Sequence, residues 1–438
     1  MNHPNITPPL VASLVAILLL APTLSRAAVV SLDREQQLGR QLFTDSDLSL
    51  NRNQSCASCH SLRRVKAPSG RGHLPTPGFV DADNVRNATA VSDGSVDGAF
   101  GALNAPSVGY AAFSPYFHWD GSEGLYIGGQ FWNGRARTLA EQAQQPFLNP
   151  VEMAMPSKWA VVSRLQENRR YVRLFRRLYD LDLDTIASYP DAPADLTPPP
   201  GVAEAYRRMS EAIAAFEKSR FFNRFTSKFD YVLAGQTRFS DQEALGFALF
   251  QGKAQCAACH TSEATLATDG RLFPPLFTDF TYDNIGMPRN WNIPGAPEPD
   301  AGLGGRSDIA AGDPEGRQIG KHKVMSLRNI AVTPPYGHNG VFATLEQVVH
   351  FYNTRDTLGQ VADNNDPGFA IDGWPEPEIS QNVNHDELGN LGLSAAEEAA
   401  IVAFLQTLTD GYPSWGNDPR VPGGTPSPFA ETPFPPLP

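Results

Sequence analysis

Cysteine, methionine, basic residues and long apolar runs are all scarce in this sequence. It has four cysteines and six methionines in 438 residues, and its 35 Lys and Arg are outnumbered by 47 Asp and Glu. The formal net charge of -12 argues against nucleic acid or an anionic membrane as a partner. An acidic protein of this kind suits a partner with a basic docking patch. The length leaves room for two domains with separate cores.

The strongly apolar run LVASLVAILLLAP lies near the N-terminus. It is shorter than the roughly 20 residues that a membrane-spanning helix needs, and the small residues of SRA, ending at Ala27, are typical of a cleavage site. We therefore predict a signal peptide over residues 1–27 and a mature, periplasmic protein that starts near Ala28. The segment before the run lacks Lys and Arg, so an uncleaved membrane anchor is the alternative.

An exported chain with four cysteines would be expected to form two disulfides, but the spacing of the cysteines indicates haem attachment. They fall in CASCH, from Cys56 to His60, and in CAACH, from Cys256 to His260. In C-x-x-C-H, two thiols one turn apart add to the vinyl groups of one haem, and the histidine ligates its iron. A zinc site would need four neighbouring ligands, whereas these pairs are roughly 200 residues apart. The sequence therefore predicts two covalently bound haem c groups, held by Cys56, Cys59, Cys256 and Cys259.

Short motifs occur in the same order in both halves of the chain. LGRQLF and LGFALF precede the two haem motifs, PYFHWDG and PYGHNG follow them, and TLAEQ and TLEQ come next. This order predicts a tandem duplication of one cytochrome c domain.

Helical signals dominate the rest of the sequence. Ser240 with Glu243 and Ser394 with Glu397 form capping boxes, and apolar residues recur at helical spacing over 157–179 and 203–218. Strand-like alternation is scarce, so we expect a mainly α fold of two tandem cytochrome c-type domains. The proline-rich YPDAPADLTPPPG, ending at Gly201, predicts the crossing between them. We expect domains over 28–200 and 201–412, and a Pro-rich tail over 413–438 that wraps the surface or is disordered.

With both haem motifs placed, the chain resembles the bacterial di-haem cytochrome c peroxidase and MauG family. The resemblance covers nearly the whole mature chain. It rests on LGRQLFTDSDLSLNRNQSCASCH, LNAPS, FWNGRARTLAEQAQQPFLNPVEM, FQGKAQCAACH, YDNIGMP and VMSLRNIAVTPPYGHNG.

The resemblance implies a role for each matching residue. His60 becomes the proximal ligand of an N-terminal peroxidatic haem, and His260 that of a C-terminal electron-transfer haem. Glu152, in NPVEM, becomes the distal acid–base residue, because one carboxylate beside the open iron face can take a proton from peroxide and return it. Trp132, in FWNGR, becomes the aromatic bridge between the haems. Trp119 is a second candidate, but its distance from Glu152 along the chain does not fit the family spacing.

The family also holds a calcium ion between its haems. The matching oxygen ligands are the Asn104 side chain and the carbonyls of Thr333 and Pro335, and hard oxygen ligands suit calcium. Two residues depart from the family pattern: Leu103 stands where Arg is usual, and Asn133 where Asp is usual.

Members of the family differ in the sixth ligand of the second haem iron. Typical peroxidases use a methionine at the position of Tyr352, whereas MauG-like members have tyrosine there. A thioether raises the reduction potential, and a phenolate lowers it by stabilising ferric and higher-valent iron. Met325 and Met287 are the alternative ligands. In that case Tyr352 is a core residue that does not bind the iron.

In the resting state of many family members, a histidine occupies the distal face of the first haem. His73 lies in the corresponding loop, where a surface role is the simpler interpretation. His118 and His338, at equivalent places in the two halves, are expected to be structural turn residues near a haem edge.

The function expected from the resemblance is that of a peroxide-dependent di-haem oxidoreductase. Hydrogen peroxide reacts at the N-terminal haem, and electrons pass through the C-terminal haem. They come either from a small cytochrome c or cupredoxin or, in a MauG-like version, from an oxidisable protein substrate. A non-catalytic di-haem electron carrier is the alternative, against which Glu152 argues. A homodimer is compatible with the resemblance.

Overall fold

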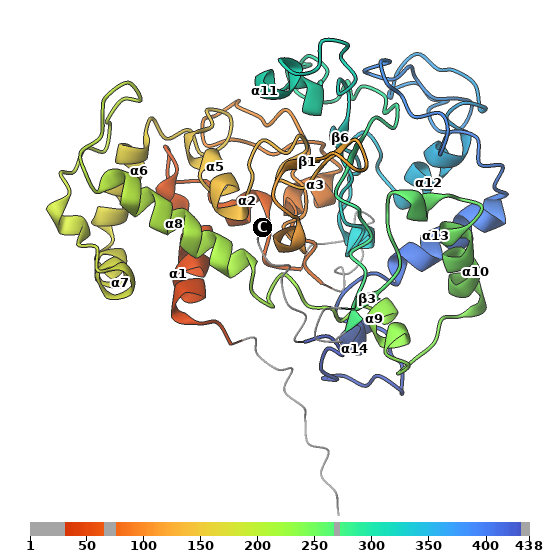
Figure 1. Ribbon diagram of the computed structural model, residues 1–438, viewed down its shortest axis with the longest axis horizontal. Helices are drawn as coiled ribbons and strands as arrows, with labels where there is room; N and C mark the ends of the chain where they lie inside the picture. The colour runs from red at the N-terminus through yellow and green to blue at the C-terminus, as the bar shows by residue number, and fades with distance from the viewer. Residues whose placement is uncertain (1–30, 65–75, 267–271, 431–438) are drawn as a thin grey trace, which may run out of the picture.

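The computed structural model describes residues 31–64, 76–266 and 272–430. The described chain is mainly helical and forms two lobes, with α1 and α6 to α8 in one and α10, α12 and α13 in the other (Figure 1). No helix in these residues is long and apolar enough to cross a membrane. The predicted signal peptide, residues 1–27, lies outside the described part of the chain.

The first lobe contains eight α-helices among the described residues, several of them short. They are α1 (Arg34–Phe43), α2 (Cys56–Cys59), α3 (Ala82–Asn87), α4 (Leu139–Gln142), α5 (Gln145–Leu148), α6 (Lys158–Glu167), α7 (Arg169–Tyr179) and α8 (Val202–Glu217).

The rest of the described chain adds six α-helices. They are α9 (Lys228–Leu233), α10 (Asp241–Gln251), α11 (Ser307–Ala310), α12 (Leu345–Thr354), α13 (Ala395–Gln406) and α14 (Tyr412–Trp415). Strands form three antiparallel pairs in the described residues: β1 (His118–Asp120) with β2 (Leu125–Ile127), β3 (Thr265–Leu266) with β4 (Leu272–Phe273), and β5 (Tyr282–Asp283) with β6 (His322–Lys323). The scarcity of strands expected from the sequence is confirmed.

The same pair of crossing helices occurs in each half. α1 crosses α8 at Gly39, where an added Cβ would lie 1.8 Å from the carbonyl oxygen of Ala212. α10 crosses α13 at Gly246, where a Cβ would lie 1.9 Å from the carbonyl oxygen of Ala400. Only glycine allows two helix backbones to approach this closely. The motifs LGRQLF and LGFALF are therefore alike because each supplies a helix crossing.

Capping signals set the helix starts as predicted. The Ser240 and Ser394 side chains cap α10 and α13, and Glu243 and Glu397 complete the boxes. The TLAEQ and TLEQ motifs start α4 and α12 with threonine N-caps. The predicted helical stretch over 157–179 is two helices, because the chain leaves the helix at Asn168, whose side chain caps α7.

Helix α8 packs in the first lobe, although the predicted boundary at residue 200 assigns it to the second domain. Its Met209, Ile213 and Phe216 share one hydrophobic cluster with α1, and this cluster ends at Phe222. The second cluster begins at Phe229. Since α8 takes the place in the first half that α13 takes in the second, the packing favours a boundary between residues 222 and 229.

The described part of the tail packs on the junction of the lobes. Val421 lies in a cluster with Tyr231 and Tyr412. The Ser427 hydroxyl donates to the Phe225 carbonyl at 2.6 Å. The described tail therefore contacts this junction at Val421 and Ser427, and residues 431–438 lie outside the described chain.

A buried ion pair sits where the two lobes meet. The Arg328 guanidinium donates to the two carboxylate oxygens of Asp230 at 3.1 and 3.0 Å, and both side chains are fully buried. Burial alone would lower the pKa of Arg328, but the carboxylate of Asp230 raises it above its usual range. Tyr110, from the first half, donates to Asp410 beside this pair at 2.9 Å.

Removing one member of this pair leaves the other charge buried. We expect Arg328→Met to destabilise the haem-loaded protein by about 3–5 kcal/mol, measured by equilibrium denaturation. The double variant Arg328→Met/Asp230→Leu should recover part of this loss. Arg169→Ala, which breaks the exposed pair with Asp184, is the control and should change stability little. An equally small effect of Arg328→Met would contradict the assignment.

Candidate functional site

The first haem motif opens onto a cavity of about 380 Å³ in the first half. Cys56 and Cys59 lie one turn apart at the two ends of α2, and both line the cavity together with His60. The second motif lines a separate cavity of about 230 Å³ with Cys256, Cys259 and His260. None of the four cysteines forms a disulfide. Each cavity thus has two thiols and one histidine at its wall, as predicted.

Both histidines are held in the same way. The Nδ1 of His60 lies 3.2 Å from the Phe79 carbonyl oxygen, and that of His260 lies 2.9 Å from the Phe277 carbonyl oxygen. Phe79 and Phe277 share positive φ angles of 57° and 56°. Burial lowers the pKa of both imidazoles to about 4. A neutral ring that donates through Nδ1 leaves Nε2 as an iron ligand, so both cavities fit a haem c.

Trp132 stands in the wall between the two cavities and lines both. Its indole N–H donates to the Asn104 carbonyl at 2.8 Å, and its own carbonyl accepts from the Lys323 amide at 2.8 Å. Trp119, the second candidate, is on β1, 50% exposed and absent from both linings. Of the two candidates, Trp132 therefore separates the two cavities and Trp119 does not.

Glu152 faces the first cavity, which His60 also lines. Asn149 donates to its carboxylate at 2.7 Å. Burial raises the pKa of Glu152, and the hydrogen bond from Asn149 and the charge of Arg135 oppose this rise. A carboxyl whose pKa is raised toward neutrality can both accept and return a proton.

Sequence reasoning missed two charged residues in these linings. Glu217 is 4% exposed, lines the first cavity, and has a carboxylate oxygen without a hydrogen-bond partner in the described chain. Lys323 lines both cavities and donates to the Ser114 hydroxyl at 2.7 Å; burial lowers its pKa to about 7. Glu217 could have been found from its place on the apolar face of α8, four residues after Ile213. Lys323 has no such local signal.

The three predicted calcium ligands meet at the wall of the first cavity. Asn104, Thr333 and Pro335 all line it, and the Asn104 amide lies 2.8 Å from the Pro335 carbonyl oxygen. The amide nitrogen faces that carbonyl, so ligation by Asn104 would require its oxygen to turn toward the ion. Amide and carbonyl oxygens are ligands that calcium accepts, and the residues therefore fit the ion in kind.

The second cavity brings together all three candidates for a sixth ligand. Tyr352, on α12, lines it with Met287 and Met325. Burial raises the pKa of the Tyr352 phenol. His73, the candidate at the first haem, lies outside the described residues.

The two turn histidines differ in their surroundings. His338 is buried, lines the second cavity, and stacks on His322 with ring centroids 3.6 Å apart. His118 is exposed on β1 and lines neither cavity. His338 therefore lies at the wall of a cavity and His118 does not, because the first repeat forms a β-hairpin where the second keeps a loop.

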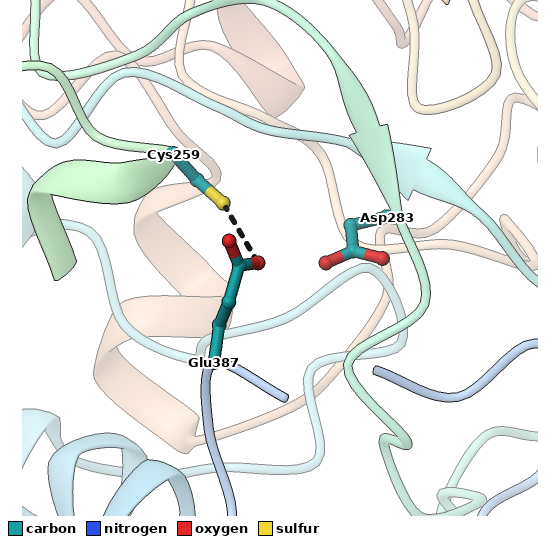
Figure 2. Close-up of side chains that lie close together, drawn as sticks. All are labelled: Cys259, Asp283 and Glu387. Atoms are coloured by element: carbon teal, nitrogen blue, oxygen red, sulfur yellow. Dashed lines mark hydrogen bonds between the residues drawn. The ribbon is translucent and has the colours of Figure 1, made fainter. Parts of the chain in front are cut away.

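A cluster of Cys259, Asp283 and Glu387 lies at the edge of the second cavity (Figure 2). The Cys259 sulfur is 4.0 Å from the Glu387 carboxylate, and Asn384 donates to Asp283 and Glu387 at 2.6 and 2.7 Å. Although this group could hold a metal ion, the Cys259 sulfur is one of the two thiols predicted to attach the second haem. The cluster therefore belongs to the haem site.

Two cavities of this construction, with one shared tryptophan, define a di-haem c-type oxidoreductase. The model of the family described as di-haem cytochrome c peroxidase matches residues 33–238. The methylamine utilization protein MauG of Paracoccus denitrificans is 38% identical over 401 residues, 90% of this chain and 93% of that protein. The chain belongs to the bacterial di-haem cytochrome c peroxidase and MauG family, whose members carry two haem c groups.

Two solved structures are similar to the whole described fold. The di-haem peroxidase BthA of Burkholderia thailandensis has a TM-score of 0.68 and 31% identity, with 88% of each chain covered. A variant of BthA in which one tyrosine is replaced by methionine has a TM-score of 0.65 and 30% identity, again with 88% of each chain covered.

The two cavities predict independent haem attachment. Cys56→Ala/Cys59→Ala should carry one covalent haem instead of two, because the thiols of the second cavity are untouched. The mirror variant, Cys256→Ala/Cys259→Ala, should also keep one. Intact mass and the pyridine haemochrome spectrum measure the number. A wild-type protein with a single haem, or a double variant that retains two, would contradict the assignment.

Proposed function

We propose that this protein is a periplasmic peroxidase-type oxidoreductase, in which hydrogen peroxide reacts in the first cavity and electrons arrive through the second. The observation that carries the proposal is the lining of the first cavity, which holds His60 and the partly buried carboxyl of Glu152. When bound, the first haem supplies the iron that takes peroxide and receives electrons. The domain order is then a peroxidatic domain, an electron-transfer domain and the Pro-rich tail.

Glu152 accepts and donates the protons of the reaction. Cleavage of peroxide requires a proton taken from one oxygen and delivered to the other. The Asn149 amide fixes one carboxylate oxygen at 2.7 Å, which leaves the other free to face the substrate. Arg135, which also lines this cavity, adds a positive charge that favours the carboxylate form.

Trp132 carries electrons between the cavities. Its ring is fixed by the hydrogen bond to the Asn104 carbonyl, and it is the indole that lines both sites. A calcium ion held by Asn104, Thr333 and Pro335 would tie the same segments together, since Asn104 contacts Trp132 through its carbonyl and Pro335 through its side chain.

Tyr352 favours a MauG-like version of this enzyme. As a phenolate ligand of the second haem iron, Tyr352 would lower the reduction potential of that iron and make it a poor acceptor from a high-potential donor. The similarity to MauG and to BthA, of which a tyrosine-to-methionine variant is known, supports this version. The substrate is then a redox protein or an oxidisable protein of the same compartment.

Glu152→Gln should lower the rate of reaction with peroxide by about 10²–10⁴-fold, because the amide cannot accept a proton. In the wild type the rate should rise as pH increases through the raised pKa of Glu152, since the deprotonated form is the base, and this rise should disappear in the variant. Stopped-flow spectra of the haems measure both. Glu298→Gln, at an exposed position, is the control. Full reactivity of Glu152→Gln would exclude the acid–base role.

Tyr352→Phe should change the low-spin ferric spectrum of the second haem, because a ligand is lost. Tyr336→Phe removes a different phenol from the same cavity and should leave the spectrum unchanged, as should Met287→Leu and Met325→Leu. Electronic and electron paramagnetic resonance spectra provide the measurement. An unchanged spectrum in Tyr352→Phe, with a change in either methionine variant, would show a thioether ligand.

A further inference from the structure

We propose that electrons enter this enzyme at Trp119 and reach the second cavity, at the wall that it shares with the first, along four aromatic rings, those of Trp119, Tyr126, Phe117 and Tyr282. We call this set the aromatic ladder. The inference rests on the proposed function, because a peroxidase must draw electrons from a donor outside its buried cavities. It gives a role to Trp119, which the candidate site leaves without one.

The outer rungs of the ladder lie on the β1–β2 hairpin. Trp119 is 50% exposed, although tryptophan is mostly buried in proteins. Its ring centroid lies 4.8 Å from that of Tyr126, directly opposite on β2. Tyr126 stacks on Phe117 at 5.3 Å with an interplanar angle of 6°. These separations are those of rings in direct contact.

Tyr282, the innermost ring of the aromatic ladder, lies beside the wall that both cavities share. Phe117 meets Tyr282 on β5 at 6.0 Å. Tyr282 pairs across the ribbon with Lys323, whose amide donates to the Trp132 carbonyl at 2.8 Å. A Cβ on Gly134, two residues after Trp132, would lie 2.1 Å from the Tyr282 hydroxyl oxygen. Only a glycine there allows the phenol to reach the turn that carries Trp132. β2, which carries Tyr126, and β5, which carries Tyr282, are accordingly in contact.

Hydrophobic packing explains the positions of Phe117, Tyr126 and Tyr282, but it does not explain the exposure of Trp119. Tyr282, Leu303 and Ile309 form a small cluster that also covers Phe117 and Tyr126, and such a cluster would gain most by burying Trp119 too. The indole instead projects into solvent at the end of a continuous line of rings. The Arg306 guanidinium lies 4.1 Å from the Phe117 centroid, which disfavours positive charge on that ring. The oxidisable positions are therefore Trp119 and the two tyrosines.

The charge beside Trp119 suits a small basic redox protein as the donor. Asp120 and Glu123 flank the indole on the hairpin, and the Ser122 hydroxyl holds the pKa of Asp120 below its usual range. The chain as a whole carries a formal charge of -12. Reduction of one H₂O₂ to two water molecules consumes two electrons and two protons. The donor gives the electrons in two single transfers at Trp119, and the protons come from solvent.

Without a donor, the ladder makes Trp119 the electron source. One water molecule adds to the indole, the adduct loses two electrons and two protons, and these reduce one hydrogen peroxide to two water molecules. The peptide then gains one oxygen atom. Trp291, which is 49% exposed and in the described chain contacts the Arg289 guanidinium and no other aromatic ring, is a matched control off the ladder.

The experiment treats the diferric protein with hydrogen peroxide alone and quantifies oxidation of both tryptophans by peptide mass spectrometry. We expect Trp119 to gain oxygen at least about tenfold faster than Trp291. Phe117→Leu removes one rung, and should lower oxidation of Trp119 to the level of Trp291 while the haem spectra still respond to peroxide. Equal oxidation of the two tryptophans in the wild type would overturn the ladder. Absence of any haem response to peroxide would instead overturn the proposed function.

A second measurement uses a basic ferrocytochrome c as donor. Trp119→Phe should slow its peroxide-dependent oxidation about tenfold or more, and Trp291→Phe should leave it unchanged. The wild-type rate should fall with added salt, because screening weakens attraction to Asp120 and Glu123. A normal rate in Trp119→Phe, with normal haem spectra, would show that electrons enter elsewhere.

Discussion

The pair formed by Arg328 and Asp230 is the interaction on which the geometry of both cavities depends. Two fully buried charges are stable only when each compensates the other, so this pair has one arrangement. Arg328 lies two residues after the segment 323–326, which lines both cavities. Its neighbour Asn329 exchanges hydrogen bonds with Asp410, at the end of the chain's last long helix, at 2.8 and 2.9 Å. Fixing Arg328 therefore fixes the wall between the cavities relative to both lobes.

The features that the sequence predicted well are those set by short spacing. Two thiols and a histidine within five residues specify a haem site wherever the chain folds. A serine with a glutamate three residues later fixes a helix start through its own hydrogen bonds, as at Ser240 and Ser394. The repeated motifs predicted structure for the same reason, because each encodes a helix crossing or a helix cap that occurs in both halves.

The features that the sequence could not predict depend on distant contacts. Proline content placed the domain crossing before α8, but α8 belongs to the first lobe because Gly39 admits its backbone. The hairpin at His118 replaces a loop of the second half, and no local pattern distinguishes them. Family spacing favoured Trp132 over Trp119, and only the folded chain shows that Trp132 lies between two cavities whose motifs are far apart in sequence. The buried Lys323 owes its place to the same distant contacts.

The two halves share a scaffold but differ in the side chains that line their cavities. A Cβ on Gly39 would lie 2.9 Å from the Phe216 side chain, and one on Gly246 would lie 2.9 Å from that of Phe404. The next residues, Glu217 and Leu405, are therefore equivalent, and each lines its own cavity. An unpartnered buried carboxyl destabilises the fold, whereas leucine at the same place does not. The scaffold accepts an apolar residue at this place, so the carboxyl of Glu217 is a feature of the first cavity's lining and is not required by the helix crossing.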